Sequence, residues 1–186
     1  TLLTEAITGL RQQVAWLSLE AADNDPIRFW MYLLAACQSI VPEIGQSAMA
    51  LLQTLQQLPD DAIPIILIND LDKSGADLVL VLDDYQAIQS PSIHAALAFL
   101  LEHLPNTFHV VISTRVDPPW PLARYRARGQ MVEIRAPDLR FTPDETAAFL
   151  NECMGLHLSA NDVAALEART EGWIASLQLA AISMIG

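Results

Sequence analysis

The stretch DLVLVLDDYQAI, residues 77–88, carries the side chains best suited to chemistry. An unbroken apolar run over residues 78–82 ends in two adjacent carboxylates, Asp83 and Asp84. Burying a charge is costly unless the charge is paired, hydrogen-bonded or bound to a metal. The pattern therefore predicts that the two acids meet a cation or a polar ligand where the strand leaves the core. The alternative is purely structural, because many strands end in Asp where they meet a loop.

A second apolar run, FHVVIST at residues 108–114, leads into Thr114 and Arg115. In an open parallel sheet, ligands bind beyond the carboxyl ends of the strands. If both runs are strands of such a sheet, the acids and the arginine reach the same edge. Carboxylates hold magnesium through its waters, and a guanidinium stabilises charge on a phosphoryl group. Together these residues indicate a site for a magnesium–phosphate ligand.

The elements that position this site are predicted from apolar spacing and helix caps. Strands are expected at 14–19, 78–82, 108–114 and 131–135, and helices at 26–40, 47–58, 62–73 and 91–103, after a helical pattern over residues 1–13. Apolar runs without two-residue alternation, separated by helices, indicate a parallel sheet covered on both faces. Asp25 suits the N-cap of its helix, with Pro26 at the first helical position.

From residue 139 onward only helical patterns remain. They begin with Thr142 and Glu145, which fit a capping box, and with Pro143 at the first helical position. The sequence therefore predicts an α/β domain over residues 1–138 and a small helical subdomain over residues 139–186.

Charge and composition exclude several classes of function. With 22 acidic and 10 basic residues, the net charge is −12, whereas nucleic-acid binding relies on clustered Lys and Arg. We expect no direct nucleic-acid binding. No apolar window reaches the roughly 18 residues that a membrane span needs. Two distant cysteines, Cys37 and Cys153, predict buried thiols in a reduced, cytoplasmic compartment, and no histidine has zinc-ligand spacing with them.

The sequence contains no phosphate-binding loop of the form G-x-x-x-x-G-K-[ST]. Its only lysine, Lys73, falls at a predicted helix end. Arg124, Arg126 and Arg128 form a small basic patch, which is either a solvated loop or a contact for phosphate or another domain. A receiver-like phosphoacceptor pocket is a weaker alternative for the acid pair, because Lys73 is misplaced for it.

Five segments occur in an order that resembles a known family: VAWLSLEAADNDPIRFWMYLLAACQSI, LVLVLDDYQAI, VVISTR, LARYRARGQMVEIRAPDLRFTPDETAAFL and TEGWIASLQLAAISM. They resemble the nucleotide-binding region of the large ATP-dependent LuxR-family transcriptional regulators, the maltose-regulon-activator group of the STAND P-loop NTPases. The resemblance covers practically the whole chain. It implies a P-loop NTPase-like three-layer parallel sheet that lacks its first strand, followed by a helical lid.

The resemblance also implies roles for individual residues. Asp83 is similar to the magnesium-associated Walker B acid, Asp84 to the acid that activates water, and Arg115 to the sensor arginine. Thr1 resembles the tail of the P-loop, so the chain is expected to begin just after the P-loop lysine. Arg128 is a further candidate for contact with the nucleotide.

For the intact parent, the resemblance implies ATP and Mg²⁺ as cofactors, slow ATP hydrolysis, a helical-repeat sensor domain and a helix-turn-helix DNA-binding domain. The fragment alone is expected to be inactive. A non-catalytic protein–protein interaction module with the same fold is the alternative. If a central strand is absent, the strands at 108–114 and 131–135 face a gap, and an open edge invites pairing with a second copy as a homodimer.

Overall fold

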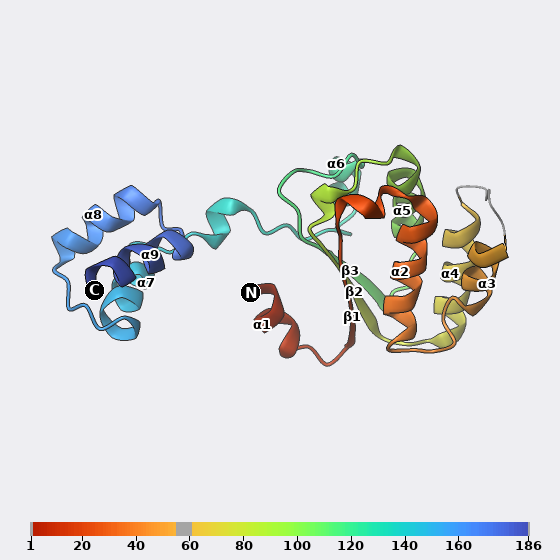
Figure 1. The fold of residues 1–186 in the computed structure, drawn as a ribbon, viewed down its shortest axis with the longest axis horizontal. Helices are drawn as coiled ribbons and strands as arrows, with labels where there is room; N and C mark the ends of the chain where they lie inside the picture. Colours follow the sequence, from red (N-terminus) through yellow and green to blue (C-terminus); the bar gives the residue numbers. More distant parts are fainter. Residues whose placement is uncertain (1, 55–60, 186) are drawn as a thin grey trace. The chain divides into compact units, whose positions relative to one another are not determined.

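The computed structural model describes residues 2–54 and 61–185, and the chain divides into two compact units, Thr1–Pro121 and Leu122–Gly186 (Figure 1). The first unit is α/β. Its elements are α1 (Leu2–Thr8), β1 (Gln13–Ser18), a 3₁₀ turn η1 (Ala21–Asn24), α2 (Pro26–Gln38), α3 (Gln46–Thr54), α4 (Ala62–Ser74), β2 (Leu78–Asp83), a 3₁₀ turn η2 (Tyr85–Ala87), α5 (Pro91–Glu102) and β3 (Phe108–Ile112). The predicted α/β class is confirmed.

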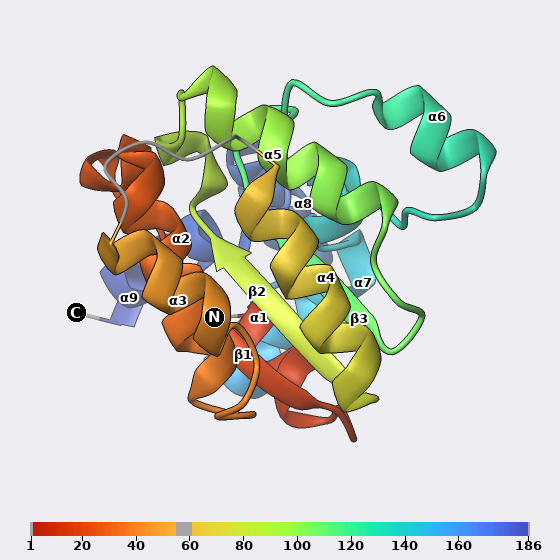
Figure 2. The same cartoon turned by 90° about the vertical axis from the view of Figure 1, so that its right-hand side faces the viewer.

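The three described strands form a parallel sheet in the order β1-β2-β3. Helices α2, α3, α4 and α5 lie over one face of this sheet (Figure 2). Alternate strand residues, among them Leu78, Leu80 and Leu82, are fully buried in the core that these helices share with the sheet. Val79 and Val81 are also buried, so β2 is apolar on both of its faces. This explains its unbroken apolar run.

Helix α2 follows the prediction closely. The Asp25 carboxylate accepts a hydrogen bond of 2.9 Å from the Arg28 backbone N–H, and Pro26 occupies the first helical position. The side chains that α2 buries recur at helical spacing: Phe29, Trp30, Leu33, Leu34 and Cys37. Burying large apolar side chains of this kind stabilises a fold by roughly 1.5–3 kcal/mol each. Burial raises the pKa of the Cys37 thiol to about 12.

The second unit is helical. Its elements are α6 (Leu122–Ala127), a 3₁₀ turn η3 (Ala136–Leu139), α7 (Pro143–Ala148), a π-helical turn η4 (Phe149–Cys153), α8 (Ala160–Thr170) and α9 (Ile174–Ile185). The predicted capping box is confirmed, with Thr142 and Glu145 bonded reciprocally at the start of α7. A small core of Leu150, Val163, Leu177 and Ala181 joins the helices. In contrast to the prediction of buried thiols, Cys153 is exposed.

Gly172 fixes the approach to α9. Its φ is +71°, and a Cβ there would lie 2.6 Å from the Phe141 carbonyl oxygen, so no other residue fits without displacement. The Phe141 N–H donates a 2.8 Å hydrogen bond to the Gly172 carbonyl. Arg140 adds an ion pair of 2.9 Å with Glu171. These contacts hold the segment before α7 against the turn between α8 and α9.

The strand predicted at residues 131–135 is wrong. The segment forms no strand, and Val132 and Ile134 are 92% and 69% exposed. A strand needs a neighbour to satisfy its backbone, and within the described part of the chain no strand pairs with this segment.

The division between the units also falls earlier, after Pro121, than the predicted boundary after residue 138. The role of residues 139–186 as a lid stays a prediction.

Among the residues that the structure describes, no helix is long and apolar enough to cross a membrane. Helices α3 and α4 correspond to the helices predicted at 47–58 and 62–73, and the predicted end of the first at residue 58 lies outside the described residues. Lys73 lies in the last turn of α4, as expected.

Asn24 connects η1 with the loop that follows β2. Its amide donates to the carbonyls of Ala87 (2.7 Å) and Ala21 (3.0 Å). Its side-chain oxygen accepts from the backbone N–H groups of Gln89 (2.6 Å) and Ser90 (3.0 Å). One half-buried side chain therefore satisfies four backbone groups, three of them in the loop from β2 to α5.

We expect Asn24→Ala to lower the free energy of unfolding by about 1–3 kcal/mol, because two backbone donors lose their partner. Asn24→Asp, which keeps the acceptor and loses the donor, should cost less. Denaturant unfolding followed by tryptophan fluorescence measures both. If the two variants unfold like the wild type, Asn24 does not hold this loop.

Candidate functional site at the carboxyl ends of β2 and β3

The acid pair lies where β2 ends. Asp83 is the last residue of the strand and is half-buried, and its carbonyl accepts a 2.9 Å hydrogen bond from the Leu19 N–H. Asp84 is exposed and has φ +58° and ψ +41°, in the left-handed region. Residues other than glycine adopt this conformation at a cost, and Asp is among those that tolerate it best. The chain thus turns sharply between the two carboxylates.

Ser113, the first residue after β3, joins β3 to both acids. Its backbone N–H donates to the Leu82 carbonyl (3.0 Å), and its carbonyl accepts from the Tyr85 N–H (2.9 Å). Its hydroxyl donates to the Asp83 carboxylate and accepts from the Asp84 N–H (3.2 Å). The parallel pairing of β2 with β3 brings the ends of the two strands together. The expectation that the acids and the end of the second run share one edge is therefore correct.

Arg115 lies two residues beyond Ser113, and its side chain is exposed. Its backbone N–H donates to the Gln86 side-chain oxygen (3.2 Å), and the Gln86 amide donates to the Asp84 carboxylate (2.7 Å). The backbone of Arg115 is therefore two hydrogen bonds away from Asp84. The structure brings Asp83, Asp84 and the Arg115 backbone into one connected network.

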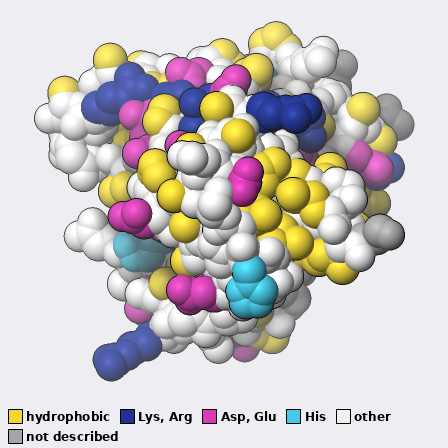
Figure 3. Space-filling model, turned by 90° about the vertical axis from the view of Figure 1, so that its left-hand side faces the viewer, with side chains coloured by type: hydrophobic (Ala, Val, Ile, Leu, Met, Phe, Trp, Pro, Cys, Tyr) yellow, Lys and Arg dark blue, Asp and Glu magenta, His cyan; other side chains and the backbone are white. Residues whose placement is uncertain are grey.

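The other predicted site residues are placed differently. Arg128 follows α6 in the second unit, and its side chain is exposed. Thr1 lies outside the described residues. Within the basic patch, Arg126 is bound to Glu133 at 2.6 and 2.8 Å. Arg126 and then Arg135 lower the pKa of Glu133 to about 2. On the face drawn in Figure 3, basic side chains lie in separate groups among acidic ones.

Sequence reasoning missed Ser113 and Gln86 as parts of the site. The available signal was their position, since Ser113 lies at the end of the second apolar run and Gln86 lies two residues after Asp84. Their contacts depend on the register of β2 against β3, which pairs Leu82 with Ile112. That register is a property of the fold and not of either segment alone.

An aromatic cluster of Tyr85, His94 and Trp120 lies next to the turn formed by Asp83 and Asp84, which we call the acid turn. The Tyr85 hydroxyl and the His94 Nδ1 are 2.7 Å apart, and the Tyr85 ring lies 5.0 Å from the ring of Trp120. The indole N–H of Trp120 donates to the His94 carbonyl (3.0 Å). Burial raises the pKa of Tyr85 and lowers that of His94. A cavity of about 270 Å³, lined by Tyr85, Gln86, His94, Thr114 and Asp117 among others, opens beside this cluster.

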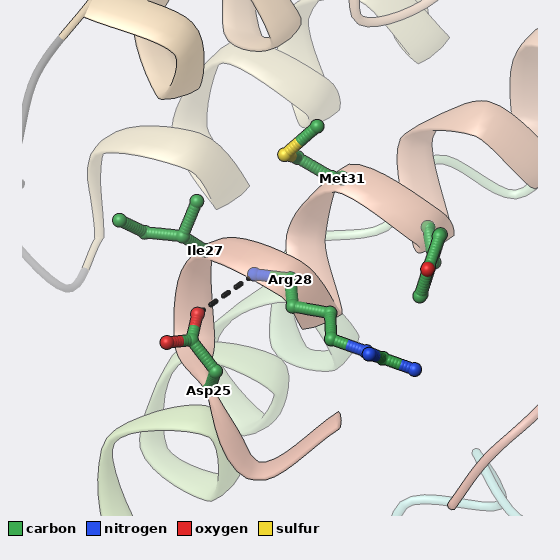
Figure 4. Close-up of a pocket in the computed structure, with 5 residues that line it drawn as sticks. Asp25, Ile27, Arg28 and Met31 are labelled. Atoms are coloured by element: carbon green, nitrogen blue, oxygen red, sulfur yellow. Dashed lines mark hydrogen bonds between the residues drawn. The ribbon is translucent and has the colours of Figure 1, made fainter. Parts of the chain in front are cut away.

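A larger hollow of about 410 Å³ lies at the start of α2, where Asp25, Ile27, Arg28 and Met31 line it (Figure 4). The Arg28 guanidinium is bound by Asp23 at 2.8 Å and by Glu20, and Asp23 raises its pKa. Because two acids already neutralise this arginine, the hollow offers no free positive charge to a phosphate. The acid turn remains the better candidate for nucleotide chemistry.

The donor set at the acid turn suits a hard, hydrated cation. Two carboxylates are ligands that Mg²⁺ accepts, mostly with several waters and substrate phosphates completing its octahedron. Within the described residues no three His, Cys, Asp or Glu side chains cluster as a metal site. The two acids fit a magnesium ion that arrives with a phosphate ligand better than a dedicated protein cage.

Comparison with known proteins identifies relatives that match nearly the whole chain. It is 33% identical over 176 residues to the serine/threonine-protein kinase PknK of Mycobacterium tuberculosis, a match covering 93% of this chain and 16% of the kinase. It is 33% identical over 183 residues to the HTH-type transcriptional regulator MalT of Serratia proteamaculans, covering 98% of this chain and 20% of MalT. MalT of Vibrio cholerae is 30% identical over 172 residues, or 92% of this chain and 19% of MalT.

No protein-family profile matches the chain. The chain spans about a fifth or less of the length of the curated relatives described above. Its parallel α/β unit and helical unit are those of a P-loop NTPase-like module. The resemblance of the chain to part of the MalT-like HTH-type transcriptional regulators is confirmed by these matches.

We expect the stability of the first unit to fall as the pH drops below about 6.5, in part through His94. The folded state keeps this imidazole neutral at a pH where the unfolded chain already takes up a proton. Stability is therefore present above pH 6.5 and is lost toward the lowered folded pKa.

Urea unfolding at pH 7.5 and pH 5.5 tests this expectation. His94→Gln retains a hydrogen-bonding group but does not titrate, so it should flatten the pH dependence. His109→Gln, at an exposed position on β3, controls for the substitution itself. An unchanged pH slope in His94→Gln would show that His94 contributes nothing to it.

Proposed function

We propose that this chain is the nucleotide-binding switch module of a bacterial LuxR-type transcriptional regulator. The observation that carries the proposal is the network at the ends of β2 and β3, where Ser113 joins the two acids and Gln86 links Asp84 to the Arg115 backbone. Such an edge is where α/β proteins of this kind bind their ligands. Binding of Mg·ATP there would order the strand ends, and slow hydrolysis would reset the switch.

Each residue of the site would have a role that follows from the chemistry of its side chain. Asp83, half-buried and held by Ser113, would bind the hydrated magnesium ion, which supplies positive charge to the phosphates. Asp84, more exposed, would accept a hydrogen bond from the attacking water. Arg115 would contact the terminal phosphate through its exposed guanidinium. Arg128 and Thr1 are further candidates for contact with the nucleotide.

The range of relatives supports a switch over a catalyst of one particular reaction. The same stretch of sequence recurs in a protein named as a kinase and in proteins named as HTH-type regulators. A role common to both is control of another part of the polypeptide. In the regulator that we propose, those parts are a helical-repeat sensor domain and a DNA-binding helix-turn-helix domain.

A non-catalytic interaction module is the second candidate, and α9 favours it. Leu179, Ile182, Met184 and Ile185 on this helix are 52–69% exposed, and the helix carries no charged residue. Exposed apolar side chains gathered on one helix commonly mark a surface that a partner covers. Pairing of a second copy along β3, which has one neighbour in the described sheet, stays a further prediction.

Calorimetric titration of Mg·ATP tests the first candidate. We expect binding by a full-length polypeptide that extends N-terminally through a P-loop, and none by the 186-residue chain. Asp83→Asn in the full-length polypeptide should weaken Mg·ATP binding about tenfold or more, a loss of roughly 1.4 kcal/mol or more.

Asp77→Asn is the matched control, because Asp77 immediately precedes the same strand at its opposite end. It should bind Mg·ATP like the wild type. Absence of binding by both chain lengths would favour the interaction module. Tight binding by the 186-residue chain alone would mean that other residues build the site.

A further inference from the structure

Gln86 occupies a position that neither the acid motif nor the arginine motif includes. It lies in η2, half-buried, between the acid turn and the loop after β3. Its side chain contacts Asp84 on one side and the backbone of Arg115 on the other. It also lines the cavity of about 270 Å³ beside Tyr85.

The orientation of the Gln86 amide is fixed by its partners. A carboxylate can only accept hydrogen bonds, and a backbone N–H can only donate one. The NH₂ group must therefore face Asp84, at 2.7 Å, and the oxygen must face the Arg115 N–H, at 3.2 Å. The flipped amide would place like groups together at both contacts. One planar group thus sets both distances at once.

Asp84 is held from two directions. Ser113 accepts a hydrogen bond from its backbone N–H at 3.2 Å, and Gln86 donates to its carboxylate. The backbone of Asp84 is in the left-handed region, which is unfavourable for a residue with a side chain. Ser113 restrains the turn, and Gln86 restrains the direction of the carboxylate.

We infer that Gln86 is a positioning residue that couples the Asp84 carboxylate to the loop carrying Arg115. The inference rests on the proposed nucleotide site. A shift of the Arg115 backbone toward a terminal phosphate moves the Gln86 oxygen with it, and the rigid amide carries the Asp84 carboxylate along. Asp84 then takes its hydrolytic position only when Arg115 is engaged, so hydrolysis follows recognition of the triphosphate.

Two variants of Gln86 distinguish its hydrogen bond to Asp84 from its hydrogen bond to the Arg115 N–H. Gln86→Met has a similar length and removes both hydrogen bonds. Gln86→Glu keeps an acceptor for the Arg115 N–H but faces Asp84 with a second carboxylate. Gln89→Ala changes a second glutamine lining the same cavity and is the matched control.

The first measurement needs no nucleotide. Hydrogen–deuterium exchange of the Arg115 amide, resolved by peptide fragmentation in the full-length polypeptide, should be about five- to tenfold faster in Gln86→Met, as expected for loss of one hydrogen bond. It should be unchanged in Gln86→Glu and Gln89→Ala. Equal exchange in Gln86→Met and the wild type would overturn the link, whatever the nucleotide does.

The second measurement is the split between binding and turnover. Since the Gln86 amide is committed to Asp84 and to the Arg115 N–H, Gln86→Met and Gln86→Glu should bind Mg·ATP within about twofold of the wild type but hydrolyse it about tenfold more slowly. Gln89→Ala should match the wild type in both respects. Unchanged turnover, or a parallel loss of affinity and turnover, would overturn the positioning role.

The two measurements keep this inference distinct from the proposed function. A wild-type polypeptide that does not bind Mg·ATP refutes the proposed function and the catalytic half of the inference. The exchange of the Arg115 amide still decides whether Gln86 links the two segments. Normal wild-type binding with unchanged variant turnover refutes the role of Gln86 alone.

Discussion

The architecture of the first unit depends on the parallel pairing of β2 with a neighbour on each side. Residues 78–82 pair with both β1 and β3, and all five side chains are buried. A strand that is bonded along both edges and covered on both faces has no place for an unpaired charge. Its first carboxylates therefore come where the pairing ends. The same pairing places the end of β3 beside the end of β2. The contacts that build the core therefore also bring the polar residues of this edge together.

Local signals in the sequence predicted most of the elements. The starts of α2 and α7 followed from Asp25 and Thr142, because a cap is a contact between residues three positions apart. The strand prediction at 131–135 failed because an apolar run shows which side chains could be buried but not whether a partner strand exists. The shared edge of the acids and the end of β3 was predicted from their places at strand ends. Ser113 and Gln86 were missed because the hydrogen bonds that link β3 and its following loop to the acids cross about 30 residues of sequence and require the register.

The charge of the chain limits which ligands the candidate site can bind. The chain has a net charge of −12, and a polyphosphate approaching two carboxylates would be repelled. Several arginines of the described residues are already ion-paired, as Arg28 is with Asp23 and Arg126 with Glu133. In the proposed function, a divalent ion and the exposed Arg115 would each bring positive charge to the acid turn. A site of this kind would favour a nucleotide bound to its metal over the free nucleotide.

At Asp84, the residue types that suit the left-handed backbone best are not those that the proposed hydrolytic step needs. Glycine would adopt φ +58° with little cost, and asparagine would tolerate it, but neither supplies a carboxylate. Selection for a more heat-resistant protein would favour replacements that abolish the proposed hydrolytic step. Laboratory evolution of this chain for thermal tolerance, without selection for ATP turnover, would thus drift toward a form that lacks the proposed hydrolytic step. In the proposed function, that form would bind nucleotide and stay in the bound state.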